Sequence, residues 1–386
     1  MNSIEWLARL VGVDTTSRHS NLPLINLVQD WFANHRVVTR LTFNAQKTKA
    51  NLVASLPTQE GSLSGGLLLS GHTDVVPVDG QEWLTNPFEM IEKDGLLYGR
   101  GTCDMKGFLA VMLASLPHLQ KQRFKKPLHF AFSFDEEIGC LGAPLLIKDL
   151  QEAGIRPDAC IVGEPTMMLP VIAHKGINVF RCRVHGRAVH SSLTPEGCNA
   201  IEYSAKLIHY LHSLAERMRV EGPFDTAFDV PFTSLSTNMI HGGIATNTVP
   251  ALCEFTFEFR NLPQVAPQLI QEMIVAYIQN QLLPSMRDIV AEANIEFENI
   301  AAVPAFEAND AYFYKLVTTC LDQQETKNKV AYATEAGLFQ QASIPTLLCG
   351  PGSIEQAHRE NEYIAISQLQ ACESFLKNIV RLFCVE

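Results

Sequence analysis

The sequence predicts an α/β domain interrupted by a smaller α+β domain. Helical patterns alternate with near-continuous apolar strands in the first part of the chain, and strands with one polar face replace them from residue 177. Strands that are apolar throughout belong to sheets covered on both faces, whereas alternating strands have one face in water. The α/β pattern returns after residue 301. We therefore expect a first domain made of residues 1–176 and 301–386, with residues 177–300 inserted into it.

The composition is that of a globular protein large enough for two domains. Its 386 residues, 47% hydrophobic and 18% charged, can bury a substantial core and suffice for two domains. The formal net charge of −11 argues against nucleic acid or an anionic membrane as a partner. The start, "MNSIEWLARLVGVDTTS", has helical spacing and does not resemble a secretory signal. We expect a soluble cytoplasmic protein whose ten scattered cysteines are reduced.

The elements of the first domain follow from the spacing of apolar residues. Helices are expected near residues 2–12 and 22–35, then strands at "ANLVASL" (50–56) and "GLLLSGH" (66–72). A helix at about 105–121 and the strands "LHFAFSF" (128–134) and "ACIVGEP" (159–165) come next. After the insert we expect a helix around 309–321, the strand "TLLCGPG" (346–352) and a final helix at about 366–382.

The insert is expected to be ferredoxin-like. Apolar and charged residues alternate in "INVFRCRVHG" (177–186), and a helix is expected at about 197–219. The strands "FTSLSTNMIHG" (232–242) and "ALCEFTFEFR" (251–260) precede a helix near 264–285 and a strand near 292–300. The order of strand, helix, strand, strand, helix, strand is the ferredoxin-like pattern, an open sheet with helices on one face.

Acids and histidines stand where strands of the first domain should end, which is where open α/β sheets build their sites. His72 and Asp74 are two residues apart, so they point to the same side of a strand. The carboxylate could therefore accept a hydrogen bond from one imidazole nitrogen. The other candidates are Asp104 in "GRGTCDMKG", Glu136 and Glu137 in "FSFDEEIG", Glu164 in "IVGEPT" and His358 in "GPGSIEQAH".

Each position also has an ordinary structural explanation. Asp104 could cap the helix that follows it, the acid pair could be a solvated turn, and the remaining residues could be polar groups at strand ends or on the surface. Together, however, two histidines and three carboxylates are the ligands expected for two divalent ions that share a bridging carboxylate, with one more carboxylate left as a base. Spacing alone does not identify the bridging acid, and these ligand types accept zinc, cobalt or manganese.

Six motifs in order along nearly the whole chain carry a family resemblance. These are "SGHTDVVPVD", "LYGRGTCDMKGF", "FSFDEEIG", "IVGEPT", "VHGRAVHSS" and "GPGSIEQAH". Together they resemble the co-catalytic zinc aminoacylase and carboxypeptidase (M20) family. The resemblance implies a mixed-sheet, zinc-peptidase-like catalytic domain with an inserted lid and dimerisation domain. It also implies a homodimeric, metal-dependent hydrolase of small N-acyl amino acids with two metal ions per subunit, zinc being expected and cobalt the alternative.

The resemblance assigns the metal ligands residue by residue. It implies that His72 and Glu164 bind one ion, that Glu137 and His358 bind the other, and that Asp104 bridges the two. These five residues come from separate strand ends, so no local metal motif would reveal them.

The resemblance also assigns catalytic and substrate-binding residues. Asp74 is implied to hold His72 in position, and Glu136 to act as the general base. In the insert, His190 is implied to stabilise the oxyanion in the active site of the partner subunit. Asn247 in "ATNTVP" and Arg260 at the end of "FEFR" are implied to contact substrate. A guanidinium suits this role because it binds a carboxylate through two parallel hydrogen bonds.

The substrate is indicated by two segments near the C-terminus. "YATEAGLFQQ" (332–341) and "GPGSIEQAHRENEYI" (350–364) most resemble family members that remove the acetyl group from N2-acetyl-L-ornithine in arginine biosynthesis. Glu335 could face the free δ-ammonium of that substrate and repel a succinyl carboxylate. The alternatives are a succinyl-diaminopimelate desuccinylase or another N-acyl-amino-acid deacylase, a peptidase with one zinc ion, and a binding protein without catalysis.

Overall fold

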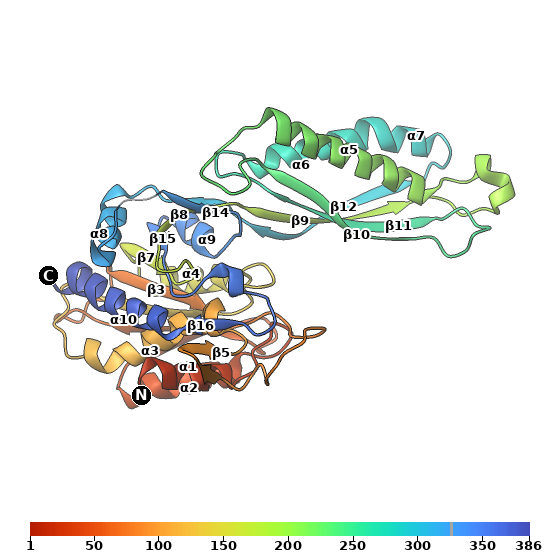
Figure 1. Ribbon diagram of the computed structural model, residues 1–386. Coiled ribbons are helices and arrows are strands. Elements are labelled where there is room, and N and C mark those ends of the chain that lie inside the picture. Colours follow the sequence, from red (N-terminus) through yellow and green to blue (C-terminus); the bar gives the residue numbers. More distant parts are fainter. Residues whose placement is uncertain (325–326) are drawn as a thin grey trace. The chain divides into compact units, whose positions relative to one another are not determined.

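The computed structural model describes residues 1–324 and 327–386. The chain divides into two compact units, and each is described by itself (Figure 1). Unit 1 contains Met1–Ile172, Glu307–Asn328 and Thr334–Glu386. Unit 2 contains Ala173–Phe306 and Lys329–Ala333.

Unit 1 is built on a mixed sheet that begins in the order β1-β2-β6-β3-β7-β15. Strand β3 pairs in parallel with both β6 and β7, and β7 pairs in parallel with β15. Strands β1 and β2 continue the sheet in antiparallel pairing. The strands that lie wholly in unit 1 are β1 (Thr39–Phe43), β2 (Ala50–Leu56), β3 (Leu67–His72), β6 (Leu128–Ser133), β7 (Ala159–Val162) and β15 (Thr346–Leu348). The strands β8 (Val171–His174), β13 (Phe306–Glu307) and β14 (Asn328–Val330) each contain residues of both units.

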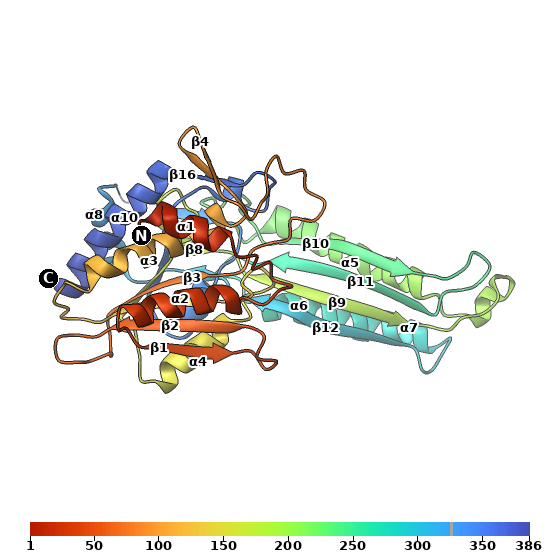
Figure 2. The same cartoon turned by 90° about the horizontal axis from the view of Figure 1, so that it is seen from below.

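Helices cover both faces of this sheet, as the unbroken apolar strands predict (Figure 2). Helices α1, α2, α3, α8 and α10 share one buried cluster with Leu69, Phe130 and Phe132. Helices α4 and α9 contact each other and the sheet with residues outside that cluster. The helices are α1 (Ser3–Val11), α2 (Leu22–Asn34), α3 (Gly107–Leu119), α4 (Ala143–Glu152), α8 (Ala311–Leu321), α9 (Ala336–Gln341) and α10 (Ile366–Val380). The predicted α/β class is confirmed.

A second, three-stranded sheet of unit 1 was not expected from the sequence. Its strands are β4 (Ile91–Lys93), β5 (Leu96–Tyr98) and β16 (Tyr363–Ala365), and β5 lies in the middle. All three residues of β4 are exposed, so no apolar pattern marks it. The pairing of β5 with β16 brings residues near 360 next to residues near 100.

Unit 2 has a four-stranded antiparallel sheet in the order β10-β11-β9-β12, packed against helices (Figure 1). Buried and half-buried residues alternate along β9, so its core side chains face those helices. The elements are β9 (Ile177–His185), α5 (Ala200–Glu221), β10 (Ser234–Gly242), β11 (Leu252–Arg260), α6 (Pro267–Tyr277), α7 (Leu283–Arg287) and β12 (Asn294–Val303). The single helix predicted at 264–285 is instead α6, a π-helical turn at Ile278–Leu282, and α7.

Two further properties concern the whole described chain. Among the described residues, no helix has both the length and the apolar character needed to cross a membrane. All ten cysteines lie in the described part, are buried, and form no disulfide.

Candidate metal centre

The candidate site lies at the carboxyl ends of parallel strands in unit 1. Strand β3 ends at His72, and Glu164 comes two residues after the end of β7. Asp104 lies in a single π-helical turn, Thr102–Lys106, with non-helical φ and ψ of −119° and 98°. The N-cap of α3 is Lys106, so Asp104 is not the helix cap that the sequence allowed.

The five predicted ligands come together in two groups of three. His72, Asp104 and Glu164 form one group, and Asp104, Glu137 and His358 form the other. In each group the potential ligand atoms all lie within 4.8 Å of one another. Asp104 presents Oδ1 at 3.0 Å from His72 Nε2 and Oδ2 at 3.5 Å from His358 Nε2. A carboxylate with one oxygen toward each group has the arrangement of a bridging ligand.

The acids of both groups carry atoms that a cation would satisfy. Glu137 Oε1 and Glu164 Oε1 are buried and have no hydrogen-bond partner among the described residues. A buried, unpaired carboxylate is costly unless it is protonated or binds a cation. The His358 side chain, whose Nε2 is 2.9 Å from Glu137 Oε2, is 56% exposed, so its group opens to solvent. The carboxylate and imidazole donors therefore fit two divalent ions.

The crowding of acids shifts their pKa values. Burial, followed by repulsion from Asp104, raises the pKa of Glu137 to about 7. Burial also raises the pKa of Glu164 well above its usual range, again with repulsion from Asp104. Burial acts in the same direction on Asp104, but hydrogen bonds with His358 and His72 outweigh it and hold the pKa of that carboxyl below its usual range. Strongly shifted acids in one cluster are typical of a functional site.

His72 is held by the main chain. Its Nδ1 lies 3.0 Å from the carbonyl oxygen of Asp74, whereas the Asp74 carboxylate oxygen is 3.6 Å away. The carbonyl of Asp74 is thus a nearer acceptor for Nδ1 than the carboxylate that the sequence suggested. A carbonyl only accepts, so Nδ1 donates the hydrogen bond between them, and Nε2, 3.0 Å from Asp104 Oδ1, is the ring nitrogen that faces the metal groups.

The Asp74 carboxylate has a different set of partners, which the sequence did not reveal. It accepts hydrogen bonds from the N–H groups of Glu136 and Glu137 at 3.1 and 3.2 Å and from the Ser17 hydroxyl at 2.8 Å. Asp74 therefore fixes the turn after β6 that carries the predicted base and one predicted ligand. Contacts to main-chain N–H groups leave no mark in the sequence.

Glu136 belongs to neither metal group. Its Oε1 accepts a weak hydrogen bond from Cys140 Sγ at 3.6 Å. Burial raises the pKa of Glu136 well above its usual range; His72 opposes this, and the neighbouring carboxylates, Glu164 first, reinforce it. A half-buried carboxyl with a raised pKa beside a metal centre can accept and return a proton.

Glu335 stands at the N-cap position of α9, a short helix that the sequence did not predict. It is 1% exposed, and neither carboxylate oxygen has a hydrogen-bond partner among the described residues. The Ser133 hydroxyl lies near Glu335 and lowers its pKa, but the hydrogen bond that this hydroxyl donates goes to the Gly71 carbonyl at 3.4 Å. Burial dominates and raises the pKa of Glu335 to about 7.

The three remaining predicted residues lie in unit 2. His190 and Asn247 are exposed and adjacent, because His190 bridges to Thr248 and the N–H of Ser191 donates to the Asn247 carbonyl at 2.9 Å. The N–H of Ser192 donates to His190 Nδ1 at 3.2 Å, so the neutral ring carries its proton on Nε2. Arg260 ends β11, and its Nε donates to Glu258 at 3.0 Å.

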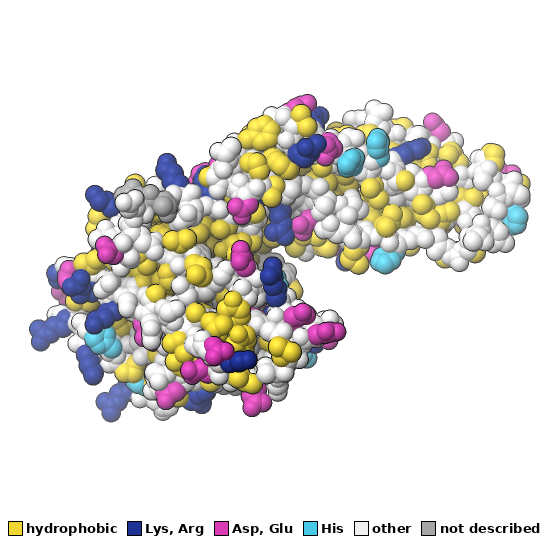
Figure 3. Space-filling view, viewed as in Figure 1, with side chains coloured by type: hydrophobic (Ala, Val, Ile, Leu, Met, Phe, Trp, Pro, Cys, Tyr) yellow, Lys and Arg dark blue, Asp and Glu magenta, His cyan; other side chains and the backbone are white. Residues whose placement is uncertain are grey.

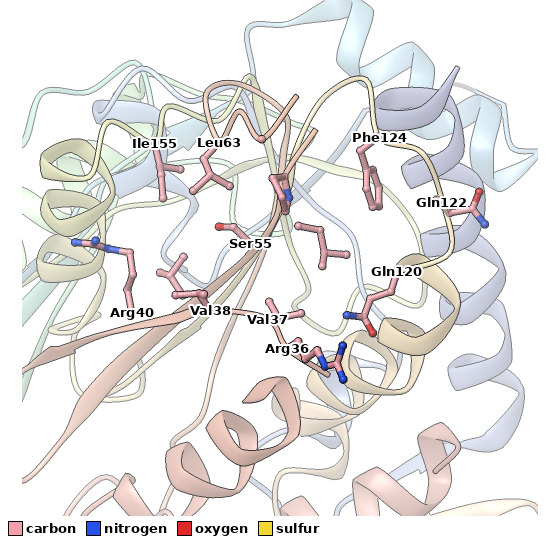
Figure 4. Close-up of a pocket in the computed structure, with 14 residues that line it drawn as sticks. Arg36, Val37, Val38, Arg40, Ser55, Leu63, Gln120, Gln122, Phe124 and Ile155 are labelled. Carbon is pink, nitrogen blue, oxygen red and sulfur yellow. The ribbon is translucent and has the colours of Figure 1, made fainter. Parts of the chain in front are cut away.

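A pocket of about 520 Å³ elsewhere on unit 1 contains none of the predicted residues (Figure 4). Its lining comes from the segments around β1 and β2, from residues 120–124 and from Ile155, and it includes Val37, Leu63 and Phe124. No acid, histidine or cysteine is among its lining residues. It therefore lacks the groups for metal binding or proton transfer.

Comparison with known proteins agrees with this geometry. Residues 68–382 match the model of the peptidase family M20/M25/M40. Acetylornithine deacetylase of Pasteurella multocida (strain Pm70) is 36% identical over 376 residues, covering 97% of this chain and 94% of that protein. Acetylornithine deacetylase of Shigella sonnei (strain Ss046) is 35% identical over 372 residues, covering 95% of this chain and 92% of that protein.

Solved structures share the fold. Aminopeptidase PepT from Bacillus cereus has a TM-score of 0.74 at 18% identity, covering 98% of this chain and 97% of that chain. The YXEP protein of Bacillus subtilis, a dinuclear metal binding peptidase, has a TM-score of 0.70 at 16% identity with the same coverage, 98% and 97%. The family resemblance drawn from the six motifs is confirmed: the chain belongs to the peptidase family M20/M25/M40.

Proposed function

We propose that this protein is a metal-dependent amidohydrolase that removes the acetyl group from N2-acetyl-L-ornithine, giving L-ornithine and acetate. The observation that carries the reaction type is the pair of ligand groups that share Asp104, with Glu136 beside them. The substrate is supported by two acetylornithine deacetylases that match nearly the full chain at 36% and 35% identity. The reaction belongs to arginine biosynthesis, which implies a cytoplasmic enzyme.

The metal ions in this proposal are held by the five predicted ligands. His72 and Glu164 would hold one ion, Glu137 and His358 would hold the other, and Asp104, which belongs to both groups, would bind both. Zinc is the proposed metal, and cobalt would fit the same donors. When bound there, two divalent ions polarise the amide carbonyl and lower the pKa of a water molecule toward neutrality.

The proton transfers are assigned to Glu136. As base it accepts a proton from the attacking water, and as acid it gives that proton to the leaving amine. An amine leaves poorly unless it is protonated, so one carboxylate serves both steps. We assign His190, acting from the partner subunit, to the oxyanion, because its Nε2–H can donate while Ser192 occupies Nδ1.

Substrate recognition is assigned to three residues. Arg260 and Asn247 would bind the α-carboxylate and the acyl amide, since a guanidinium suits a carboxylate. Glu335 would bind the δ-ammonium of ornithine. Its two unpaired, buried oxygens support this role, because such a carboxylate is stabilised by a cationic ligand.

The experiment that tests the function is amine release from N2-acetyl-L-ornithine and N-succinyl-diaminopimelate, measured side by side with zinc-loaded protein and a chelated control. We expect chelator-sensitive turnover of the acetyl substrate alone. Preference for the succinyl substrate would refute the specificity assigned to Glu335 but keep the reaction type. Absence of turnover with both would refute the proposed activity.

We also propose a homodimer formed through unit 2. Strand β10 is an edge of the four-stranded sheet, and such an edge offers unpaired main-chain groups to another chain. Met239 and Ile240 on β10 are 56% and 50% exposed, and the nearby Ile244 is 90% exposed. Hydrophobic side chains also reach the surface among the helices of unit 2 (Figure 3). A second copy would cover this edge.

Light scattering after size exclusion tests the dimer. We expect the mass of two chains for the natural protein and of one chain for Ile240→Lys, because a buried lysine at a strand edge opposes pairing. Val220→Lys, at a residue 66% exposed on the end of α5, is the matched control. A monomeric natural protein would refute the proposal.

A further inference from the structure

A buried carboxylate outside the five proposed ligands borders the candidate metal centre. Glu362 is 1% exposed and comes four residues after His358, just before β16. Neither the metal-binding nor the proton-transfer proposal gives it a role. A buried acid needs partners for its oxygens, and the partners of Glu362 are informative.

All four side-chain hydrogen bonds of Glu362 go to the segment that carries Asp104. Its Oε1 accepts from the N–H groups of Cys103 and Asp104, at 2.8 and 3.0 Å. Its Oε2 accepts from the N–H of Gly101 at 2.9 Å and from Arg100 Nη1 at 2.8 Å. A carboxylate has about four lone-pair sites, so Glu362 is fully used in holding this one turn of the chain.

The partner cation, Arg100, holds the segment that carries His358. It is 1% exposed, and Nη1 also donates to the Arg359 carbonyl at 3.1 Å. Its Nη2 donates to Gln81 Oε1, and Gln81 Nε2 in turn donates to the His358 carbonyl at 2.8 Å. The guanidinium lies over the ring of Trp83, 5.0 Å from its centre. One ion pair therefore fixes the main chain at both metal-binding segments.

We propose that the buried Arg100–Glu362 ion pair is a positioning element that holds Asp104 and His358 at the separation that metal binding requires. This inference rests on the proposed metal site. His358 has a φ of 63°, which an L-residue adopts only when its surroundings hold it there. The carbonyl contacts from Gln81 and Arg100 to residues 358 and 359 supply such a restraint.

The substitution Glu362→Gln removes part of this restraint without changing the size of the side chain. An amide oxygen can still accept from Cys103 and Asp104, but the amide NH₂ would then face two donors, the Gly101 N–H and the Arg100 guanidinium. The Asp104 turn and the His358 segment would lose their shared anchor. Loss of a group that orients a metal ligand typically lowers metal affinity about 10- to 100-fold.

The test measures zinc binding without substrate. Metal-free natural protein and the E362Q variant are titrated with zinc against a chromogenic chelator, and circular dichroism confirms that the variant is folded. We expect two ions on the natural protein, and an affinity about 10- to 100-fold weaker for at least one of them on E362Q. The control is Glu355→Gln, which removes an exposed carboxylate from the same segment; its affinities should match the natural protein.

Every other outcome contradicts either the positioning role of the Arg100–Glu362 pair or the proposed metal site on which that role rests. Folded E362Q with natural zinc affinities overturns it. If E362Q does not fold, Arg100→Lys is tested in its place, since lysine keeps the charge but lacks the planar fork of the guanidinium. Natural zinc affinities in a folded Arg100→Lys protein overturn the inference. A failure of this second variant to fold also overturns it. A natural protein that binds no zinc refutes the proposed metal site itself. A protein that binds two ions but releases no amine refutes the proposed activity alone.

Discussion

Neighbouring residues in the candidate site have different surroundings and hence different proposed tasks. Glu137 lies 2.9 Å from His358 and belongs to a metal group, whereas Glu136 belongs to neither and accepts a weak hydrogen bond from the Cys140 thiol. The Asp74 carboxylate accepts hydrogen bonds from the N–H groups of both residues and so restrains the turn that carries them. These surroundings suit Glu137 to the proposed role of metal ligand and Glu136 to the proposed role of base, although the two side chains are identical.

The first prediction follows from that separation. Glu136→Gln should keep two zinc ions per subunit but lower kcat about 10²- to 10⁴-fold, because an amide cannot carry the proton. Glu137→Gln is the matched variant, and it should lose zinc affinity. Chelator titration and initial rates at saturating zinc distinguish the two. Natural turnover in Glu136→Gln would show that another group is the base.

The second prediction concerns the charge of Glu335. Glu335→Gln should raise KM for N2-acetyl-L-ornithine about tenfold, equivalent to ~1.4 kcal/mol, because the ammonium loses a charged partner. N2-acetyl-L-norvaline lacks the ammonium, so its KM should be the same with both proteins. Steady-state rates for the two substrates test this. An unchanged KM for acetylornithine would mean that Glu335 does not bind the ammonium.

Single residues differ in how far the sequence reveals them. A recognisable motif around each residue allowed five ligands to be proposed, namely His72, Asp104, Glu137, Glu164 and His358. The links made by Asp74, Glu362 and Arg100 could not, because they join side chains to main-chain groups of distant segments. Such groups are present at every residue and carry no sequence signal.

At the scale of elements, close packing of α3 against β7 positions Glu164. Gly163 follows the end of β7, and a Cβ added there would lie 2.0 Å from the ring of Phe108, a fully buried residue of α3. The helix can approach the strand this closely only because residue 163 has no side chain. This contact lies one residue before Glu164, a proposed metal ligand.

The third prediction tests this contact. Gly163→Ala should lower the free energy of unfolding by about 1–3 kcal/mol, because an extra methyl group overfills a packed core. In Gly12→Ala the nearest atom, the Ala8 carbonyl oxygen, would be 3.3 Å from the new Cβ, so its effect should be smaller. Urea unfolding measures both variants. Equal midpoints for Gly163→Ala and the natural protein would contradict the packing argument.

Buried apolar strands were predictable even when short, as β15 is, whereas helix α4 and the exposed strand β4 were not. Strands β3 and β6 are buried at every residue, and their apolar runs mark them in the sequence. Strand β4 is exposed throughout, and β16 has three residues whose partner strand lies far away in the chain. Such strands are stabilised by pairing with segments that are distant in the chain, and the local sequence pattern does not indicate this pairing.

At the scale of the whole molecule, the candidate metal centre exists only because the fold gathers separate segments. The proposed ligands end β3, follow β6 and β7 or lie in the turns at Asp104 and His358, and the parallel strands bring their ends to one edge. The insertion of unit 2 between residues 172 and 307 leaves all five ligands in unit 1. The chain therefore separates metal binding from the residues proposed for the lid.

The most direct test of the account is a titration of the metal-free protein with zinc while amine release from N2-acetyl-L-ornithine is measured. The two groups that share Asp104 predict no turnover without metal and full turnover when two equivalents per subunit are bound. Turnover that is complete at one equivalent would contradict the two-ion centre. Turnover that persists in the chelated protein would contradict the metal-dependent reaction itself.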